Sequence, residues 1–475
     1  MVVVALIVMC GTSVGLPARA TYGAHTSGDE PYYLLTATSV AEDHDLDISD
    51  ELRSQSYTPY HEIPLDPQTA PVGGDARISP HDPLLPVLLA PVMTYGWLAA
   101  KLWLAMLTAV TAALTTRLAI RRFDLPPVLT VVVVGGLFLG IPLAPYATQV
   151  YPEMPAALLV VVAVDAIITM DALSRPRRWW SCAALLLAVT SLPWLSVKYV
   201  PLAVVLALGA AWQLWRTRQR PLIVTGGVVL LMAATAYLMF HHIHYGGWTV
   251  YAAGDHFIDT GEFSVVGTSP DVVGRSRRLI GLLVDRSFGI ATWSPAWLAT
   301  PAAIAVVITD RVRHRAILLA PVLTGWCVAT FVALTMHGWW VPGRQIVAVL
   351  PLLAVALAVA AQRLRFVGVF VGAGVVAGLI NWLWLAIEAS TGRRTLIVDF
   401  AQTRSWPYRL LSWMMPDGLS GGLTADLWLA AWGVALLASA VWAARLVRRR
   451  SSAGAQPFEP VAQPPLTGSD RQAVV

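Results

Sequence analysis

The stretch Ser27–Tyr33, which reads SGDEPYY, places two adjacent carboxylates just after the first apolar segment of the chain. Adjacent acidic residues are common on solvated surfaces, so the pair alone does not define a site. Its position, where the chain would leave a membrane, is more informative, because charge near the hydrocarbon is costly and often functional. Asp29 and Glu30 are therefore the first candidate functional residues.

The composition identifies an integral membrane protein. Of the 475 residues, 56% are hydrophobic and 13% are charged, and the mean hydropathy is +0.62. Soluble domains contain about 25% charged residues. The formal charge of +5 does not indicate nucleic-acid binding, because the arginines occur in short clusters between apolar runs. The three cysteines lie in apolar runs without a metal-binding spacing.

Twelve apolar segments approach the roughly 20 residues needed to cross a bilayer. The first, residues 1–16, lacks a basic region, so we interpret it as a retained span rather than a cleaved signal peptide. The others are residues 88–116, 125–144, 154–173, 179–195, 199–215, 221–241, 291–309, 316–336, 346–361, 366–388 and 425–444. The sequence thus predicts an all-α polytopic protein with about 12 transmembrane helices.

Arginine clusters follow every second span. They lie within residues 117–122, 175–178, 216–220, 311–315, 363–365 and 445–450. By the positive-inside rule these loops and both termini are cytoplasmic. The outer loops are then residues 21–83, 145–153, 192–198, 242–290, 337–345 and 389–424. We expect one transmembrane domain over residues 1–446, followed by a disordered cytoplasmic tail over residues 447–475.

The large first outer loop is rich in acids. Pro31–Val40 is predicted to form a short amphipathic helix on the bilayer, with its tyrosines at headgroup level. The segment Asp43–Asp47 alternates like a fragment of a calcium loop, but it lacks the glycine and terminal glutamate of an EF-hand. A solvated loop is the alternative interpretation.

Charged residues at the other outer span ends form the second set of candidates. Glu153 stands between two prolines at the start of a span, where a helix N-terminus would also stabilise it. Lys198 either reaches toward the interface or binds a phosphate. Arg286 and Arg344 lie on the outer side against the positive-inside pattern, and arginine offers a fork of donors suited to phosphate. Interface anchoring is the alternative role of Arg344.

Taken in order, these stretches resemble bacterial membrane glycosyltransferases of the GT-C fold, the superfamily of protein O-mannosyltransferases and aminoarabinose transferases. The similarity covers approximately residues 20–390. It is carried by GDEPYYL at 28–34, HDPLLPVLLAP at 81–91, PWL at 193–195, FGI at 288–290 and WWVPGR at 339–344. Several of these pieces look like parts of uncharacterised actinobacterial members.

The resemblance implies an inverting transfer of a sugar from a polyprenyl-phosphate donor to an envelope acceptor on the outer membrane face. Asp29 matches the first-loop aspartate that acts as base or orients the acceptor, and Glu153 matches a second acidic position. The expected roles are catalytic for Asp29, Glu30 and Glu153, donor-phosphate binding for Lys198, Arg286 and Arg344, and acceptor or loop contacts for Tyr33, His81 and Trp340. A divalent ion, Mg²⁺ or Mn²⁺, bridging Asp29 or Glu153 to the phosphate is compatible with these oxygen ligands.

Two other function classes fit parts of the sequence. A transporter or flippase for a lipid-linked glycan also needs about twelve spans, but transporters place polar residues near the bilayer midplane. Here nearly every charge lies at a span end, and Asp165 is the main exception. A non-catalytic envelope scaffold would tolerate the loss of Asp29, Glu153 and Arg344.

Overall fold

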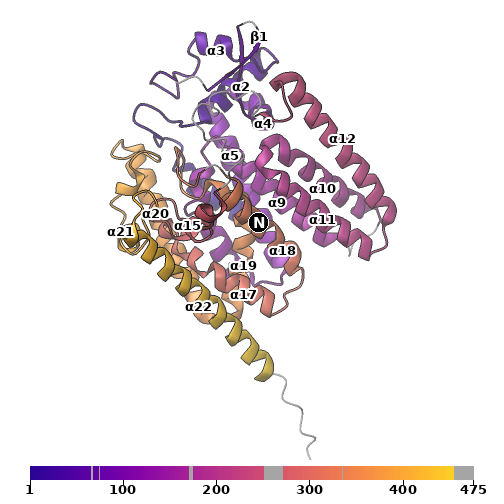
Figure 1. Cartoon of the computed structure of the whole chain (residues 1–475), viewed down its shortest axis with the longest axis vertical. Helices are drawn as coiled ribbons and strands as arrows, with labels where there is room; N and C mark the ends of the chain where they lie inside the picture. Colours follow the sequence, from indigo (N-terminus) through magenta and orange to yellow (C-terminus); the bar gives the residue numbers. More distant parts are fainter. Residues whose placement is uncertain (66–67, 74, 171–174, 251–270, 334, 454–475) are drawn as a thin grey trace, which may run out of the picture.

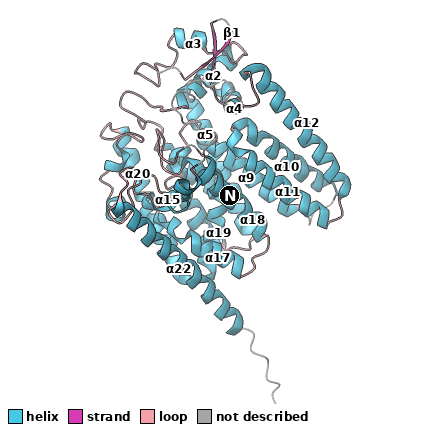
Figure 2. Ribbon diagram, in the orientation of Figure 1, coloured by secondary structure: helices cyan, strands magenta, loops and turns pink. Residues whose placement is uncertain are grey.

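The computed structural model describes residues 1–65, 68–73, 75–170, 175–250, 271–333 and 335–453. These residues form a helical bundle with one short β-hairpin, β1 (Ala70–Gly73) and β2 (Ala76–Ile78), which lies in the first outer loop (Figure 2). Parts of the predicted loop 242–290 and tail 447–475, namely residues 251–270 and 454–475, lie outside the described residues.

Seven helical segments in the described part of the chain are long and apolar enough to cross a membrane. Three of them are single helices: Trp97–Arg122 (α5), Arg220–Tyr245 (α12) and Arg365–Ser390 (α20). Three more combine a helix with a short turn: Val197–Arg216 contains α11 (Val200–Arg216), Arg315–Val332 begins with α18 (Arg315–Cys327), and Arg344–Arg363 contains α19 (Leu350–Arg363). The last, Leu423–Arg450, is part of α22 (Leu423–Ala453). Shorter apolar helical stretches cover Val2–Ser13 (α1), Leu84–Met93 (α4), Pro127–Phe138 and Pro295–Thr309. The predicted polytopic class is confirmed, and the count of twelve spans stays a prediction.

Helix α19 forms the centre of the bundle. Every residue from Leu350 to Ala361 is buried, and the helix packs against α5, α18, α20 and α17 (Thr300–Thr309). It is preceded by the short 3₁₀ turn η7 (Arg344–Val349), which packs on α9 (Glu153–Thr169). Arg344 therefore opens the turn that leads into α19, which lies in the most buried of the seven long apolar segments of the described residues.

Two long helices lie at the edges of the bundle. Helix α12 runs along one side beside α10 (Arg175–Leu195), and α22 runs diagonally below the others (Figure 1). Most of their side chains are exposed although they are apolar, as in Leu231, Met232, Val434 and Leu437. Such surfaces are expected where helices face lipid instead of water.

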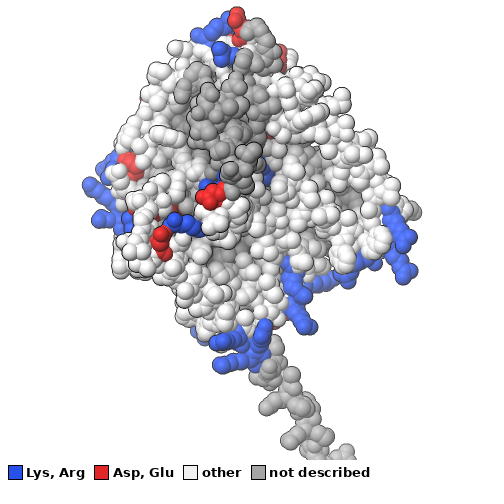
Figure 3. Space-filling view, viewed as in Figure 1, with Lys and Arg blue, Asp and Glu red and all other residues white. Residues whose placement is uncertain are grey.

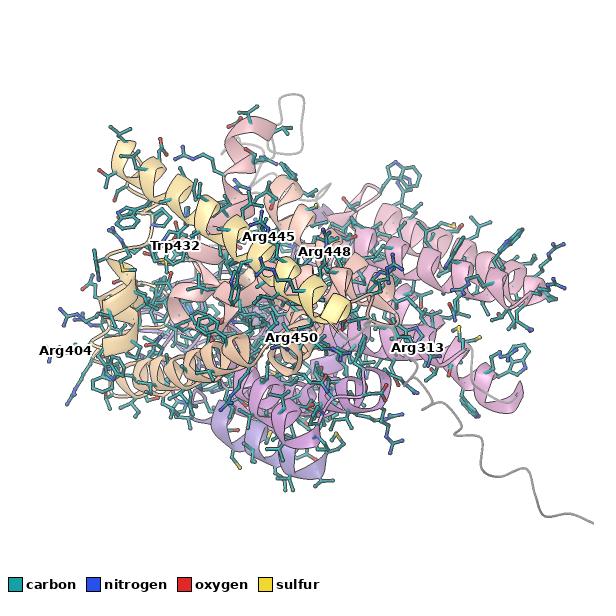
Figure 4. All side chains as sticks on the ribbon, turned by 90° about the horizontal axis from the view of Figure 1, so that it is seen from below. Arg313, Arg404, Trp432, Arg445, Arg448 and Arg450 are labelled. Carbon is teal, nitrogen blue, oxygen red and sulfur yellow. The ribbon has the colours of Figure 1, made fainter. Side chains whose placement is uncertain are left out.

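Positively charged side chains gather at the end of the molecule opposite the first outer loop. Arg121 and Arg122 end α5, and Arg216 ends α11. Lys and Arg groups line the lower edge in Figure 3, and Figure 4 shows that face from below, with Arg313 near the start of α18 and Arg445, Arg448 and Arg450 along α22. Asp165, the charge expected deep in a span, lies at this end, paired with Arg122 at 2.8 Å.

The first outer loop folds as a cap over the other end of the bundle. It contains α2 (Glu30–Glu42) and α3 (Ser49–Arg53) besides the hairpin, and leads into α4. The helix predicted over Pro31–Val40 is present as α2. However, Tyr32 and Tyr33 are buried, because α2 packs against α4, so their predicted place at headgroup level was wrong.

The C-terminal boundary also differs from the prediction. Helix α22 extends to Ala453, so residues 447–453, assigned from the sequence to a disordered tail, are helical. Arginine has a high helix propensity, and cations at a helix C-terminus interact favourably with the dipole.

Candidate active site

Asp29 stands at the end of the bundle that the first loop caps, directly before α2. Gly28 has a positive φ of +52°, and a Cβ atom at this position would lie 3.0 Å from the hydroxyl oxygen of Tyr151. A glycine is therefore required for the chain to turn close to Tyr151. Asp29 occupies the N-cap position of α2, but its side chain makes no capping bond and faces the bundle instead.

Glu30 has a different environment from its neighbour. Its side chain is fully buried, and Oε2 accepts a hydrogen bond of 2.8 Å from the backbone N–H of Val150, while Oε1 accepts one of 3.2 Å from the N–H of Ser27. Glu30 thus joins the start of α2 to the loop before α9. This geometry suits a residue that positions the loop, because both oxygens already have partners.

Glu153 and Lys198 form a buried pair beside Asp29. Glu153 is the first residue of α9 and is fully buried, and its Oε1 lies 2.7 Å from the Nζ of Lys198. Lys198 lies in the short turn between α10 and α11. Its ammonium group therefore contacts a carboxylate of the site and does not simply extend to the interface.

Arg344 links the two acidic positions. Its Nη2 lies 2.6 Å from Oδ2 of Asp29, and its Nε lies 3.0 Å from Oε1 of Glu153. The guanidinium also lies 4.0 Å from the ring centre of Tyr151 and 5.0 Å from that of Trp340. Cation–π contacts of this kind strengthen when water is excluded. The structure thus brings together Asp29, Glu153, Lys198, Arg344 and Trp340.

His81 and Tyr33 complete one wall of the site. The Nε2 of His81 lies 3.6 Å from Oδ1 of Asp29, and its Nδ1 lies 2.6 Å from the Oγ of Ser79. The ring of Tyr33 lies 4.7 Å from the His81 ring. Of the three residues predicted to contact the acceptor or the loop, His81 therefore contacts Asp29, Tyr33 packs on His81, and Trp340 packs on Arg344.

Arg286 is not part of this group. Its Nη1 lies 3.0 Å from Oδ2 of Asp417 and its Nε donates to the carbonyl of Ser412. The residue after Asp417, Gly418, donates its N–H to Asp285, which also accepts a hydrogen bond from the N–H of Phe288. In the described residues Arg286 does not pair with Asp29, Glu153 or Arg344, and its donor-phosphate role stays a prediction.

Two supporting residues were missed by the sequence reasoning. Asp82 accepts hydrogen bonds from the Tyr237 hydroxyl at 2.9 Å, from the His241 Nε2 at 3.1 Å and from the Val197 N–H at 3.0 Å. It thereby ties α12 and the Lys198 turn to the segment that carries His81. The sequence signal that could have identified Asp82 is its position next to His81. Tyr151 was missed also, although it stands two residues before Glu153 in the printed sequence.

The electrostatics separate the two adjacent acids. Burial by itself would raise the pKa of Asp29, but the Arg344 guanidinium and His81 hold that pKa well below its ordinary value. In Glu30, burial raises the pKa above its ordinary value despite the charge of Lys101 and the two backbone donors. Asp29 is therefore a stable anion in the resting site.

Several polar atoms around these pairs have no hydrogen-bond partner among the described residues. They are Oε2 of Glu153, both amide atoms of Gln149, the Tyr199 hydroxyl and the Nε1 of Trp340. Buried polar atoms are normally paired. Unused donors and acceptors beside a charged group are what a polar ligand such as a sugar phosphate would engage.

The predicted Mg²⁺ or Mn²⁺ site has no further support here. Arg344 lies between Asp29 and Glu153, and the group of three potential metal ligands that the described residues contain lies elsewhere, at Asp43, Asp50 and Glu51. Metal use at the active site therefore stays a prediction.

The arrangement of the helices is similar to the GT-C fold that the sequence resemblance predicts. A similar solved structure is the crystal structure of ArnT from Cupriavidus metallidurans bound to undecaprenyl phosphate. The TM-score is 0.52, and the sequence identity is 14% over 95% of this chain and 78% of that chain. At this identity the likeness shows the fold alone. No protein-family profile and no curated protein matches the sequence.

Proposed function

We propose that the chain is a glycosyltransferase that moves a sugar from a polyprenyl-phosphate donor to an acceptor hydroxyl of an envelope glycan, lipid or protein. The observation that carries the proposal is the bridge made by Arg344 between Asp29 and Glu153, with Lys198 bound to the same Glu153 oxygen. The departure of a phosphate requires cations that stabilise its negative charge, and activation of a hydroxyl requires a carboxylate as base. Arg344 and Lys198 supply the cations, and Asp29 supplies the carboxylate.

The reaction is a single displacement at the anomeric carbon. The acceptor oxygen forms a bond to this carbon as the bond to the phosphate oxygen breaks, and the bonding electrons leave with the polyprenyl phosphate. The hydroxyl proton moves to Asp29. Attack on the face opposite the leaving group inverts the anomeric configuration.

Binding of the donor would activate Asp29. In the resting site, burial alone would raise the pKa of Asp29, but the charge of Arg344 outweighs this effect and keeps the pKa low. A carboxylate with a low pKa is a weak general base. A donor phosphate that shares the Arg344 guanidinium weakens its contact with Asp29. The pKa of Asp29 then rises toward that of an effective base only when the donor is bound.

The arrangement favours an extracytoplasmic active site in the cytoplasmic membrane with both termini inside. The arginine clusters lie at the end of the bundle opposite Asp29 (Figures 3 and 4). Under the positive-inside rule that end is cytoplasmic. Asp165, the deep charge that fitted a transporter, is paired with Arg122 and Arg117 at this end.

The test is transfer by purified protein in liposomes. The substrates are polyprenyl phosphates carrying a radiolabelled pentose or hexose, with an envelope extract as acceptor. We expect labelled acceptor and free polyprenyl phosphate from the wild type, and neither from Arg344→Gln. Movement of intact donor across the bilayer without bond cleavage would overturn the proposal in favour of a flippase.

A further inference from the structure

A second group of acidic side chains lies at the other end of α2 from Asp29. Asp43 directly follows α2, and Asp50 and Glu51 stand in the first turn of α3. One carboxylate oxygen from each of the three lies within 4.8 Å of the others. These elements are at the top of the molecule in Figure 1, within the first outer loop.

Glu51 is buried without a partner. Its side chain is 3% exposed, and neither carboxylate oxygen has a hydrogen-bond partner in the described part of the protein. The hydroxyl of Tyr60, also 3% exposed, is likewise unpaired, and besides burial the Glu51 charge raises the pKa of Tyr60. A buried carboxylate without a donor or counter-charge is strongly unfavourable. The vicinity of Glu51 therefore offers unused oxygen atoms.

The three ionisable groups of the cluster are all acidic, and the cation of α3, Arg53, donates its Nε to the carbonyl of Ser49. Among the described residues, none of Asp43, Asp50 and Glu51 forms an ion pair with Lys, Arg or His. Asp43 is the C-cap of α2, and a helix C-terminus carries partial negative charge. Burial raises the pKa of Glu51 to about 8, and the charges of Asp50 and Asp43 act in the same direction.

The rest of the alternating segment is already engaged. Oδ1 of Asp45 accepts from the Ser39 hydroxyl at 2.9 Å, and Oδ1 of Asp47 accepts from the N–H groups of Ser49 and Arg77. Only Asp43 of the predicted calcium-loop fragment therefore joins the cluster. Its partners come from α3 instead of from the alternating segment itself.

We propose that Asp43, Asp50 and Glu51 bind a calcium ion that fastens the C-terminal end of α2 to α3. Oxygen-only ligands suit a hard divalent cation, and calcium accepts irregular geometry with water filling the remaining positions. The ion would neutralise Glu51 and the end of α2. It would stabilise the helix whose opposite end holds Asp29, without taking part in sugar transfer.

The test uses full-length protein in detergent, treated with EDTA, dialysed and titrated with calcium chloride. Binding is measured by calorimetry and the melting temperature by intrinsic fluorescence. We expect one ion per chain and a saturable rise in melting temperature, half-maximal at about 10⁻⁴ to 10⁻³ M calcium, the range of extracellular calcium modules. These two measurements do not depend on glycosyl transfer, so they test the calcium site independently of the proposed activity.

Three variants make the test specific. Glu51→Gln retains the side-chain volume and removes the carboxyl group that would ionise to bind the ion, so we expect a folded protein without the calcium response. Asp50→Asn should weaken the response at least about tenfold, because calcium affinity follows the number of charged ligands. Glu42→Gln removes an exposed neighbouring charge outside the cluster and should respond like the wild type. Absence of calcium binding in the wild type, equal responses in Glu51→Gln and Glu42→Gln, or an equal response to magnesium would overturn the proposal.

Discussion

The Nη2 atom of Arg344 lies 2.6 Å from Oδ2 of Asp29, although 315 residues separate the two in sequence. The contact joins the first loop to the turn η7 that leads into the central helix α19, so the position of the candidate base depends on how that buried helix packs. Because Arg344 also contacts Glu153, one guanidinium sets the geometry of both acids.

Replacing Arg344 by lysine should impair transfer nearly as much as replacing it by glutamine. Lysine retains the charge, but a single ammonium group does not reproduce the forked contacts to Asp29 and Glu153. We expect kcat to fall about 10²-fold or more in both variants, the scale for loss of one group that stabilises developing charge. The measurement is initial rate with a radiolabelled polyprenyl-phosphate sugar.

Arg286→Gln is the matched control for this prediction. Arg286 is an outer arginine that pairs with Asp417 and not with the Asp29 group. We expect its effect on kcat to be much smaller than that of Arg344→Lys. A loss of equal size would show that Arg286 also binds the donor phosphate.

Asp29→Asn and Glu30→Gln should have different consequences. Asn retains the size of Asp29 but does not accept the acceptor proton, so transfer should fall by about 10²- to 10⁴-fold. Glu30→Gln keeps one carbonyl oxygen for the N–H of Val150 and mainly disturbs loop position. We expect a lower melting temperature with a smaller loss of kcat, and equal losses of kcat would contradict this division.

Glu153→Gln should destabilise the protein. The change leaves Lys198 and Arg344 beside each other without their shared carboxylate. Breaking a buried pair from one side typically costs about 3–5 kcal/mol. Detergent-solubilised Glu153→Gln is therefore expected to melt at a clearly lower temperature, and the double variant with Lys198→Met should recover part of the loss. Failure of the second change to restore any stability would show that the charges are not coupled.

Much of the fold could be predicted from the sequence, because hydrocarbon crossing imposes a length and composition on each span. Which residues are buried inside the bundle could not be predicted from the sequence. Pro31–Val40 contains tyrosines and aliphatic residues that suit either a bilayer surface or a protein surface, and only its packing on α4 decides between them. Hydropathy likewise did not show that Leu350–Ala361 is central and that α12 is peripheral.

For the candidate site, the sequence predicted which residues lie at the same end of the bundle but not how they pair. Asp29, Glu153, Lys198 and Arg344 all stand at outer span ends, so topology and resemblance placed them on one face. Their pairing depends on packing between η7 and α9, which the sequence does not reveal. Arg286 shared the same topological signal, yet its partner Asp417 comes from a loop whose position depends on the folded bundle.

The stabilising effect of Asp29 should persist into mildly acidic solution. Burial alone would raise the pKa of Asp29 in the folded protein, but Arg344 and His81 lower it below its ordinary value. A carboxyl with a lowered folded-state pKa contributes stability that is complete above its unfolded pKa, about 3.9, and is lost as the pH falls toward the folded value. The difference in melting temperature between wild type and Asp29→Asn should therefore be constant from pH 7 to about pH 5 and shrink below about pH 4. Glu42→Gln, an exposed acid of the same loop, provides the control for general acid effects. A difference that already disappears near pH 6 would show that Arg344 does not hold Asp29 as an anion in the resting site.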